Sequence, residues 1–201
     1  MRVAGLLVVV AALAAALGGE WPASSSSTAA SPLDVLRGEH GGLPGGHRGA
    51  LGAADGAVPD GVTVFDEDVA AVVNLDADLL GALRRAATHA AAGGVELFVV
   101  GGWRSAEYQE HLLREAVSKY GSEQEAARWV ATPDTSAHVS GDAVDVGPSD
   151  AAAWLSEHGA RYGLCQIYGN EPWHYELRPE AGDHGCPPPY ADPTHDPRMQ
   201  G

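Results

Sequence analysis

Two segments of the chain carry side chains that could bind a metal ion and use it in catalysis. The first contains His138 and Asp145, which are close in sequence with Gly141 between them, so a loop entering a strand could fold both onto one ion. The second contains Glu171 and His174. Two imidazoles and a carboxylate match the donor set of a catalytic zinc, which keeps a fourth position open for water. We therefore predict that His138, Asp145 and His174 bind Zn²⁺; the alternative is that both histidines make ordinary hydrogen bonds.

Glu171 and Arg104 are candidates for the groups that act on a substrate beside such an ion. A carboxylate held just outside the ligand set can take a proton from water. Pro172 restricts Glu171 to an extended conformation, which predicts a rigidly placed general base. Arg104 lies where a strand is expected to pass into a helix, and its guanidinium could bind a carboxylate or a developing oxyanion. A serine nucleophile is disfavoured, because neither Ser136 nor Ser140 lies in a Gly-x-Ser-x-Gly turn.

The elements that would position these residues are short helices and strands. Apolar residues at three- and four-residue spacing predict a helix over about 75–92, capped by Asn74 and ended by Gly93. Ser105 is expected to cap a second helix. Ser122 is expected to open a further short helix, and Ser149 is expected to cap another. β-type runs cover 95–100, 143–146 and 173–177, and residues 132–140 read as a loop. This mixture predicts an α+β domain, with a small antiparallel sheet and flanking helices.

Three blocks of sequence form one larger pattern. In chain order they are Gly102-Trp103-Arg104-Ser105-x-x-Tyr108-Gln109, Ser136-x-His138-x-x-Gly141-x-Ala143-x-Asp145 and Glu171-Pro172-Trp173-His174. Together they resemble the D-alanyl-D-alanine carboxypeptidase family of zinc peptidases typified by VanY. The resemblance covers roughly residues 75–177, about half of the chain.

The resemblance implies a single zinc-peptidase domain and a specific reaction. His138, Asp145 and His174 would be the zinc ligands, with Asp145 selected over the nearby Asp142, and Glu171 would be the general base. The implied activity is hydrolysis of the terminal D-Ala-D-Ala bond of a peptidoglycan stem peptide by metal-activated water.

Other matched positions are implied to contact the substrate. Arg104 would orient it or stabilise charge in the transition state, and Ser136 would donate a hydrogen bond to it. Gln109 would make either a substrate contact or a structural one. Trp173 fits a stacking surface or a core position equally well, and Glu176 fits either an exposed strand carboxylate, which is the default expectation, or a partner of the metal ligands.

The motifs leave several activities open. An endopeptidase or a D,D-dipeptidase could use the same metal site with different pocket walls. A non-catalytic cell-wall-binding module is a further alternative, although Glu171 argues against it, because a binding module needs no base.

The two ends of the chain differ in composition from its middle. Residues 1–20 begin with a positive charge followed by an apolar run, which predicts a signal peptide or an N-terminal anchor, and hence a secreted, cell-wall or membrane-anchored protein. Residues 21–61 are rich in Ser, Gly and Pro and are expected to form a flexible linker. The domain is expected over residues 62–190, with an irregular tail over 191–201.

Cys165 and Cys186 lie on either side of Glu171 and His174. In an oxidising compartment they are expected to form a disulfide, which would stabilise the domain by about 3 kcal/mol on the chain-entropy model. Two free buried thiols are the alternative.

The net charge restricts the class of partner. The chain has 12 Lys and Arg against 27 Asp and Glu, a formal charge of −15. Nucleic acid and anionic membrane surfaces both require clustered basic residues, so neither is an expected partner. With 45% hydrophobic residues the chain can bury one core. No membrane span is expected in the mature chain, and a monomer is the default.

Overall fold

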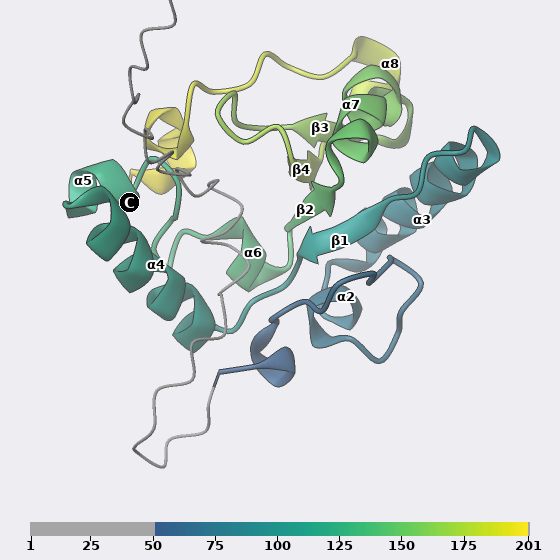
Figure 1. Ribbon diagram of the computed structural model, residues 1–201. Coiled ribbons are helices and arrows are strands. Elements are labelled where there is room, and N and C mark those ends of the chain that lie inside the picture. Colours follow the sequence, from purple (N-terminus) through teal and green to yellow (C-terminus); the bar gives the residue numbers. More distant parts are fainter. Residues whose placement is uncertain (1–50, 201) are drawn as a thin grey trace, which may run out of the picture.

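The computed structural model describes residues 51–200 and has the predicted α+β architecture (Figure 1). The expected signal peptide or anchor, and residues 21–50 of the expected linker, lie outside the described residues. The strands are β1 (Phe98–Gly101), β2 (Ala143–Gly147), β3 (Leu164–Gln166) and β4 (His174–Leu177). The helices are α2 (Ala70–Val73), α3 (Ala77–Ala92), α4 (Ala106–Tyr120), α5 (Glu123–Ala126), α6 (Ala137–Ser140), α7 (Ser149–His158) and α8 (Ala181–His184). The 3-10 helices are η1 (Ala53–Asp55), η2 (Gly159–Tyr162), η3 (Pro193–His195) and η4 (Pro197–Met199).

The sheet brings together residues that are far apart in sequence. Its strand order is β1, β2, β4, β3, and all neighbours are antiparallel. Side chains alternate between the two faces of a sheet. One face, including Val144 and Tyr175, packs against α3 and α7 in the main hydrophobic core. The opposite face carries Asp145, His174 and Glu176, and Asp145 pairs directly with His174 across the two central strands.

Helix α3 forms as predicted, but its cap is Asp76 rather than Asn74. The Asp76 carboxylate accepts hydrogen bonds from the N–H groups of Asp78 and Leu79 at 3.0 and 3.1 Å. Asn74 instead follows the last residue of the short helix α2. The N–H group of Asp76 also donates to the carbonyl of Gly141 at 2.9 Å. This contact with a distant segment helps to set the helix start, and local spacing does not reveal it.

Helix α4 begins as predicted and fixes the backbone at the wall of the site. The hydroxyl of Ser105 accepts a hydrogen bond from the N–H group of Tyr108 at 3.1 Å. Leu112 and other buried residues of α4 pack in a second, smaller core with α5. Arg104 directly precedes the cap, and its N–H group donates to the carbonyl of His138 at 3.1 Å. The start of α4 is therefore tied to the segment that carries His138.

Several short elements depart from the sequence prediction. Helix α6 lies within residues 132–140, which were expected to be a loop, while β3 and α8 were not expected at all. In helix α7 the N-cap position is occupied by Pro148. Ser149 is therefore the first residue of the helix and not its cap. Elements of three or four residues are too short to produce a recognisable periodicity. The disulfide between Cys165 and Cys186 is confirmed, and it joins β3 to the segment after α8.

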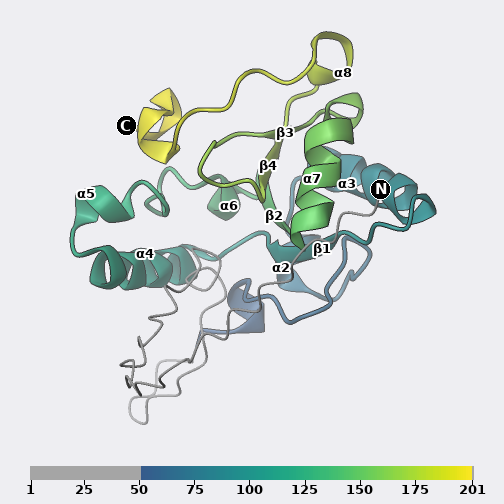
Figure 2. The same cartoon turned by 45° about the horizontal axis from the view of Figure 1, so that its top comes forward.

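Residues on both sides of the expected 62–190 domain fold against it. On the N-terminal side, the carbonyl of Asp55 in η1 accepts a hydrogen bond from the N–H group of Ser105 at 2.8 Å. On the C-terminal side, Asp192 forms an ion pair with Arg128 at 3.0 Å. Figure 2 shows the C-terminal segment, in yellow, passing from α8 to the side of the molecule where α5 and α6 lie. Within residues 51–200, no helix has the length and apolar character needed to cross a membrane.

Candidate active site

Three side chains with metal-ligand chemistry meet where the sequence predicts them. They are His138 of α6, Asp145 of β2 and His174 of β4. One ligand atom from each lies within 4.8 Å of the other two, and all three residues are buried. Burial of an uncompensated ionisable cluster is costly, so such a cluster indicates either internal pairing or a ligand.

The distances from the Asp145 carboxylate to the two histidine nitrogens fit a tetrahedral zinc. Nε2 of His138 lies 3.4 Å from Oδ1 of Asp145, and Nδ1 of His174 lies 3.2 Å from the same oxygen. Zinc bonds of about 2.0–2.1 Å at tetrahedral angles separate neighbouring donors by about 3.3–3.4 Å. These residues therefore fit the metal in donor chemistry and in the two distances from Asp145.

A hydrogen bond on the far nitrogen of each imidazole decides which nitrogen faces the metal position. Nδ1 of His138 lies 2.9 Å from the carbonyl oxygen of Gly102, which can only accept, so Nδ1 carries the proton and Nε2 is left free to bind a metal. Nε2 of His174 lies 3.3 Å from the Glu176 carboxylate, which leaves Nδ1 free to bind a metal. Second hydrogen bonds of this kind orient metal-binding histidines and select their tautomer.

The two histidines differ in their affinity for a proton. Burial lowers the pKa of His138, and the positive charge of Arg104 lowers it further. Burial also disfavours the charged form of His174, but its contacts with Asp145 and Glu176 outweigh this and raise its pKa to about 10. In the metal-free protein His174 is therefore protonated near neutral pH, and a metal ion must displace that proton to bind.

Arg104 holds Asp145 so that one carboxylate oxygen faces the histidines. Nη2 of Arg104 donates to Oδ2 of Asp145 at 2.7 Å, while Oδ1 is turned toward His138 and His174. Burial raises the pKa of Asp145, but His138, His174 and Arg104 outweigh this and hold it well below its usual range. Gly101 of β1 permits the approach, because a Cβ atom there would lie only 2.5 Å from Oδ2.

Glu171 lies beside the triad, as the prediction of a general base requires. Its Oε2 atom is 3.8 Å from Nδ1 of His174, while its buried Oε1 atom has no hydrogen-bond partner among the described residues. The backbone turns over residues 171–174 just before β4, with the N–H group of His174 donating to the carbonyl of Glu171 at 3.1 Å. Burial raises the pKa of Glu171 to about 8. An unpaired carboxylate oxygen at this position can accept a proton from a reacting group.

Gln109 is brought to the site, where it makes structural contacts. Its Oε1 atom accepts a hydrogen bond from Nη1 of Arg104 at 3.1 Å, and its Nε2 atom donates to the carbonyl of Ala131 at 2.9 Å. Gln109 is 1% exposed, so these bonds satisfy a fully buried amide. The structure therefore shows the structural contacts that were one of the two roles expected for Gln109. A contact with the substrate stays a prediction.

Ser136 lines a small cavity next to the triad. This cavity has a volume of about 30 Å³, and Arg104, Gln109 and Glu171 also contribute to its walls. Ser136 is buried, and within residues 51–200 no hydrogen bond of its hydroxyl is found. Its hydroxyl is therefore available to a molecule that enters the cavity.

The VanY family model, described as D-alanyl-D-alanine carboxypeptidase, matches residues 73–180. This match covers more than half of the chain and contains the triad, Glu171, Arg104, Gln109 and Ser136. The chain belongs to the VanY family. The expected family resemblance is thereby confirmed.

Individual relatives match only part of the chain. A D-alanyl-D-alanine carboxypeptidase from Enterococcus faecalis is 33% identical over 111 residues, which cover 43% of this chain and 41% of that protein. The chain therefore spans less than half the length of this curated relative. A mutant of the vancomycin-resistance D,D-pentapeptidase VanY, in complex with Zn(II), is 30% identical with a TM-score of 0.49, covering 51% of this chain and 72% of that chain. The LD-carboxypeptidase LdcB has a TM-score of 0.51 at 24% identity, covering 75% of this chain and 80% of that chain, and supports the fold.

Several residues around this VanY-family site were not predicted from the sequence. Tyr168 packs its ring against His174 with centroids 5.1 Å apart, and its hydroxyl donates to Asp196 at 3.1 Å. The cavity wall also includes Trp129, Pro193 and Met199. None of these residues belongs to a block that carried the resemblance, and two come from the segment expected to be an irregular tail.

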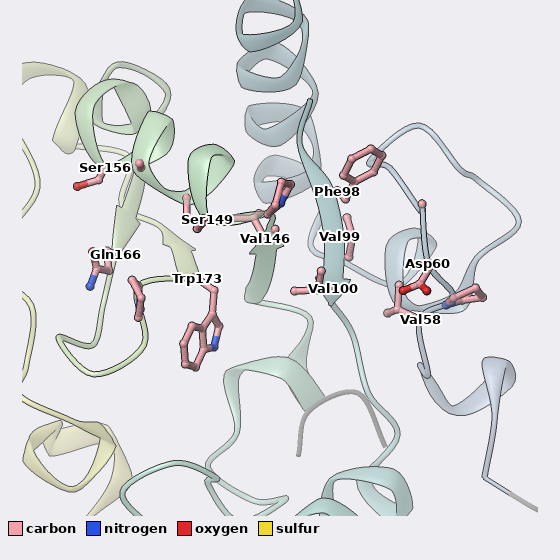
Figure 3. Close-up of a pocket in the computed structure, with 17 residues that line it drawn as sticks. Val58, Asp60, Phe98, Val99, Val100, Val146, Ser149, Ser156, Gln166 and Trp173 are labelled. Carbon is pink, nitrogen blue, oxygen red and sulfur yellow. The ribbon is translucent and has the colours of Figure 1, made fainter. Parts of the chain in front are cut away.

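Trp173 faces a second, larger hollow beside the VanY-family site. This groove has a volume of about 940 Å³ and is lined mainly by apolar side chains such as Phe98 and Val100 (Figure 3). Trp173 lines the groove and does not line the cavity beside the triad. It is 9% exposed, so it is a largely buried wall residue, and its indole Nε1 atom has no partner among the described residues.

Proposed function

We propose that this protein is a zinc-dependent carboxypeptidase that removes the terminal D-alanine from peptidoglycan stem peptides ending in D-Ala-D-Ala. The observation that carries the proposal is Glu171, a buried carboxylate with an unpaired oxygen beside a cluster of three side chains that could hold a metal ion. Membership of the VanY family supports the same reaction.

The metal would be held by Nε2 of His138, Oδ1 of Asp145 and Nδ1 of His174. A bound Zn²⁺ would supply Lewis-acid chemistry, because it makes water more acidic and polarises a carbonyl group. The chain itself keeps these donors in place through the Gly102 carbonyl, Arg104 and Glu176.

Glu171 would take a proton from the attacking water and return it to the leaving amine of D-alanine. Burial raises its pKa to about 8, and the positive charge of an ion at the triad would favour the ionised form. A base whose pKa is near the working pH gives efficient proton transfer in both directions. The reaction needs no covalent intermediate with the chain.

Arg104 and Ser136 would bind the end of the substrate. Arg104 has five N–H donors, and its side-chain hydrogen bonds to Gln109 and Asp145 use two of them. The Ser136 hydroxyl lines the same cavity. A guanidinium and a hydroxyl at one wall could bind the terminal carboxylate of a stem peptide, which would orient the scissile bond.

We further propose that the reaction takes place outside the cytoplasm, at the cell wall. The substrate class belongs there, and the disulfide between Cys165 and Cys186 is typical of oxidising compartments. The signal peptide or anchor predicted over residues 1–20 would provide export.

The test is to incubate the zinc-loaded protein with a stem pentapeptide ending in D-Ala-D-Ala and to follow the products by mass spectrometry. We expect loss of one D-alanine, no cleavage after treatment with a chelator, and recovery when zinc is restored. A tetrapeptide without the last residue should stay intact. Release of a dipeptide or an internal cut would replace the proposal by a dipeptidase or an endopeptidase. Binding of the pentapeptide without any cleavage would indicate a wall-binding module.

A further inference from the structure

Glu176 is the partner of the metal ligand His174 on the side away from the metal position. It is 1% exposed, and its Oε1 atom lies 3.3 Å from Nε2 of His174. The default expectation of an exposed strand carboxylate is therefore wrong, and the alternative, a partner of the metal ligands, fits the geometry. A carboxylate that accepts the second N–H group of a metal-binding histidine fixes the orientation of the ring.

A buried carboxylate needs cationic partners of its own, because its desolvation is otherwise uncompensated. Arg198 of η4 contacts both oxygens of Glu176, with Nη1 at 2.7 Å from Oε2 and Nη2 at 3.2 Å from Oε1. This two-pronged contact fixes the plane of the carboxylate as well as its position. Arg178, directly after β4, adds one bond to Oε2 at 2.9 Å.

Arg198 is itself held in place within the C-terminal segment. Its Nε atom lies 3.1 and 3.0 Å from the two oxygens of Asp196. Asp196 is completely buried and also accepts a hydrogen bond from the hydroxyl of Tyr168 at 3.1 Å. Asp192 ties the same segment to Arg128 at 3.0 Å. Together with the contact of Arg198 with Glu176, the segment is therefore anchored to the rest of the domain at three separate points.

This chain of contacts ends outside the part of the protein that the family model matches. The match ends at residue 180, whereas the contacts run from His174 through Glu176 to Arg198. We propose that Arg198 is a positioning residue that acts through Glu176 to hold the imidazole of His174 for metal binding. The inference rests on the zinc site of the proposed function, and it makes residues 190–200 a working part of that site.

The test compares zinc affinity in the full chain and in its variants, by competition with a chromogenic chelator. We expect R198A to raise the zinc dissociation constant by about tenfold or more, the lower end of the range for loss of a partner behind a metal ligand. R198K should recover part of this, because it restores the charge without the two-pronged contact. The charge-matched control is R85A, which removes an exposed arginine on α3 and should leave zinc affinity unchanged.

A double-mutant cycle separates positioning from general stability. If Arg198 acts through Glu176, adding R198A to E176Q should change zinc affinity by less than twofold. The pentapeptide kcat of R198A should fall while KM stays within twofold of wild type. An R198A protein that melts at a lower temperature but binds zinc as tightly as wild type would overturn the inference, as would fully additive effects in the cycle. Wild-type protein that binds no zinc at all would overturn both this inference and the proposed function.

Discussion

Replacing Glu171 by Gln should abolish activity and at the same time stabilise the metal-free protein. The substitution keeps the shape of the side chain but removes its ability to accept a proton. Loss of a general base typically costs about 10²- to 10⁴-fold in rate. Zinc content should stay near one ion per chain, because Oε2 of Glu171 lies 3.8 Å from the Nδ1 atom of His174 and Glu171 is not part of the ligand cluster.

The gain in stability follows from the raised pKa of Glu171. Burial shifts this pKa from 4.5 to about 8 in the folded metal-free protein. Below pH 4.5 both the folded and unfolded states hold the proton, so the group has no effect on stability. Between pH 4.5 and 8 the unfolded state loses the proton first, so the free energy of unfolding falls as the pH rises. At pH 7 the accumulated cost is about 3 kcal/mol.

The Gln amide should recover only part of this cost. One of its polar atoms would occupy the position of Oε1, which has no hydrogen-bond partner among the described residues. An unsatisfied buried polar atom costs about 1–3 kcal/mol, so we expect a net gain of about 1 kcal/mol at pH 7.

Urea denaturation of the chelator-treated protein at several pH values measures this effect. The fall in unfolding free energy between pH 5 and 8 should be smaller in E171Q than in wild type. The control is E157Q, which changes an exposed carboxylate on α7 and should follow wild type in both stability and activity. An E171Q protein that retains wild-type kcat would remove Glu171 from the base role. A pH profile identical to wild type would refute the reasoning about burial.

Three further predictions concern the metal site and its support. H138A should lose both bound zinc and activity, because only two protein ligands remain; metal analysis after dialysis measures the zinc content. A variant that keeps zinc and activity would remove His138 from the ligand set. G101A should weaken zinc binding by tenfold or more, because its Cβ atom would lie 2.5 Å from Oδ2 of Asp145. An unchanged zinc affinity would mean that β1 can move away from Asp145 without disturbing the metal site. Replacing Cys165 and Cys186 by Ser should lower the unfolding free energy by about 3 kcal/mol in denaturant titrations, and no change would show that the bridge adds little.

Local sequence was sufficient to predict which side chains gather at the candidate site. His138, Asp145 and His174 have side chains with a limited range of chemistry, and the blocks around them are short and continuous. The cap at Ser105 was predictable for the same reason, since a hydroxyl residue followed by a helical apolar pattern is a local signal. The placement of these groups together then follows from the antiparallel pairing of β2 with β4.

Contacts between distant segments were not predictable in this way. The spacing around Asp76 does not reveal that its N–H group meets Gly141, and β3 is too short to have a period. Residues 191–201 were expected to form an irregular tail. Arg198 contacts the buried Glu176 because the C-terminal segment folds back across the domain. A local sequence pattern does not show whether such a side chain faces solvent or a distant residue.

The direct pairing of Asp145 with His174 limits which insertions and deletions this protein can tolerate. The loops between β2 and β4 can lengthen or shorten at modest cost, since loop-closure entropy depends only weakly on length. Within β4, however, moving the pairing by one residue would turn His174 and Glu176 into the hydrophobic core and bring Tyr175 to the metal face. Insertions in the loops between the strands can therefore change the shape of the walls around a substrate. A shift of the strand register by an odd number of residues would instead remove His174 and Glu176 from the site.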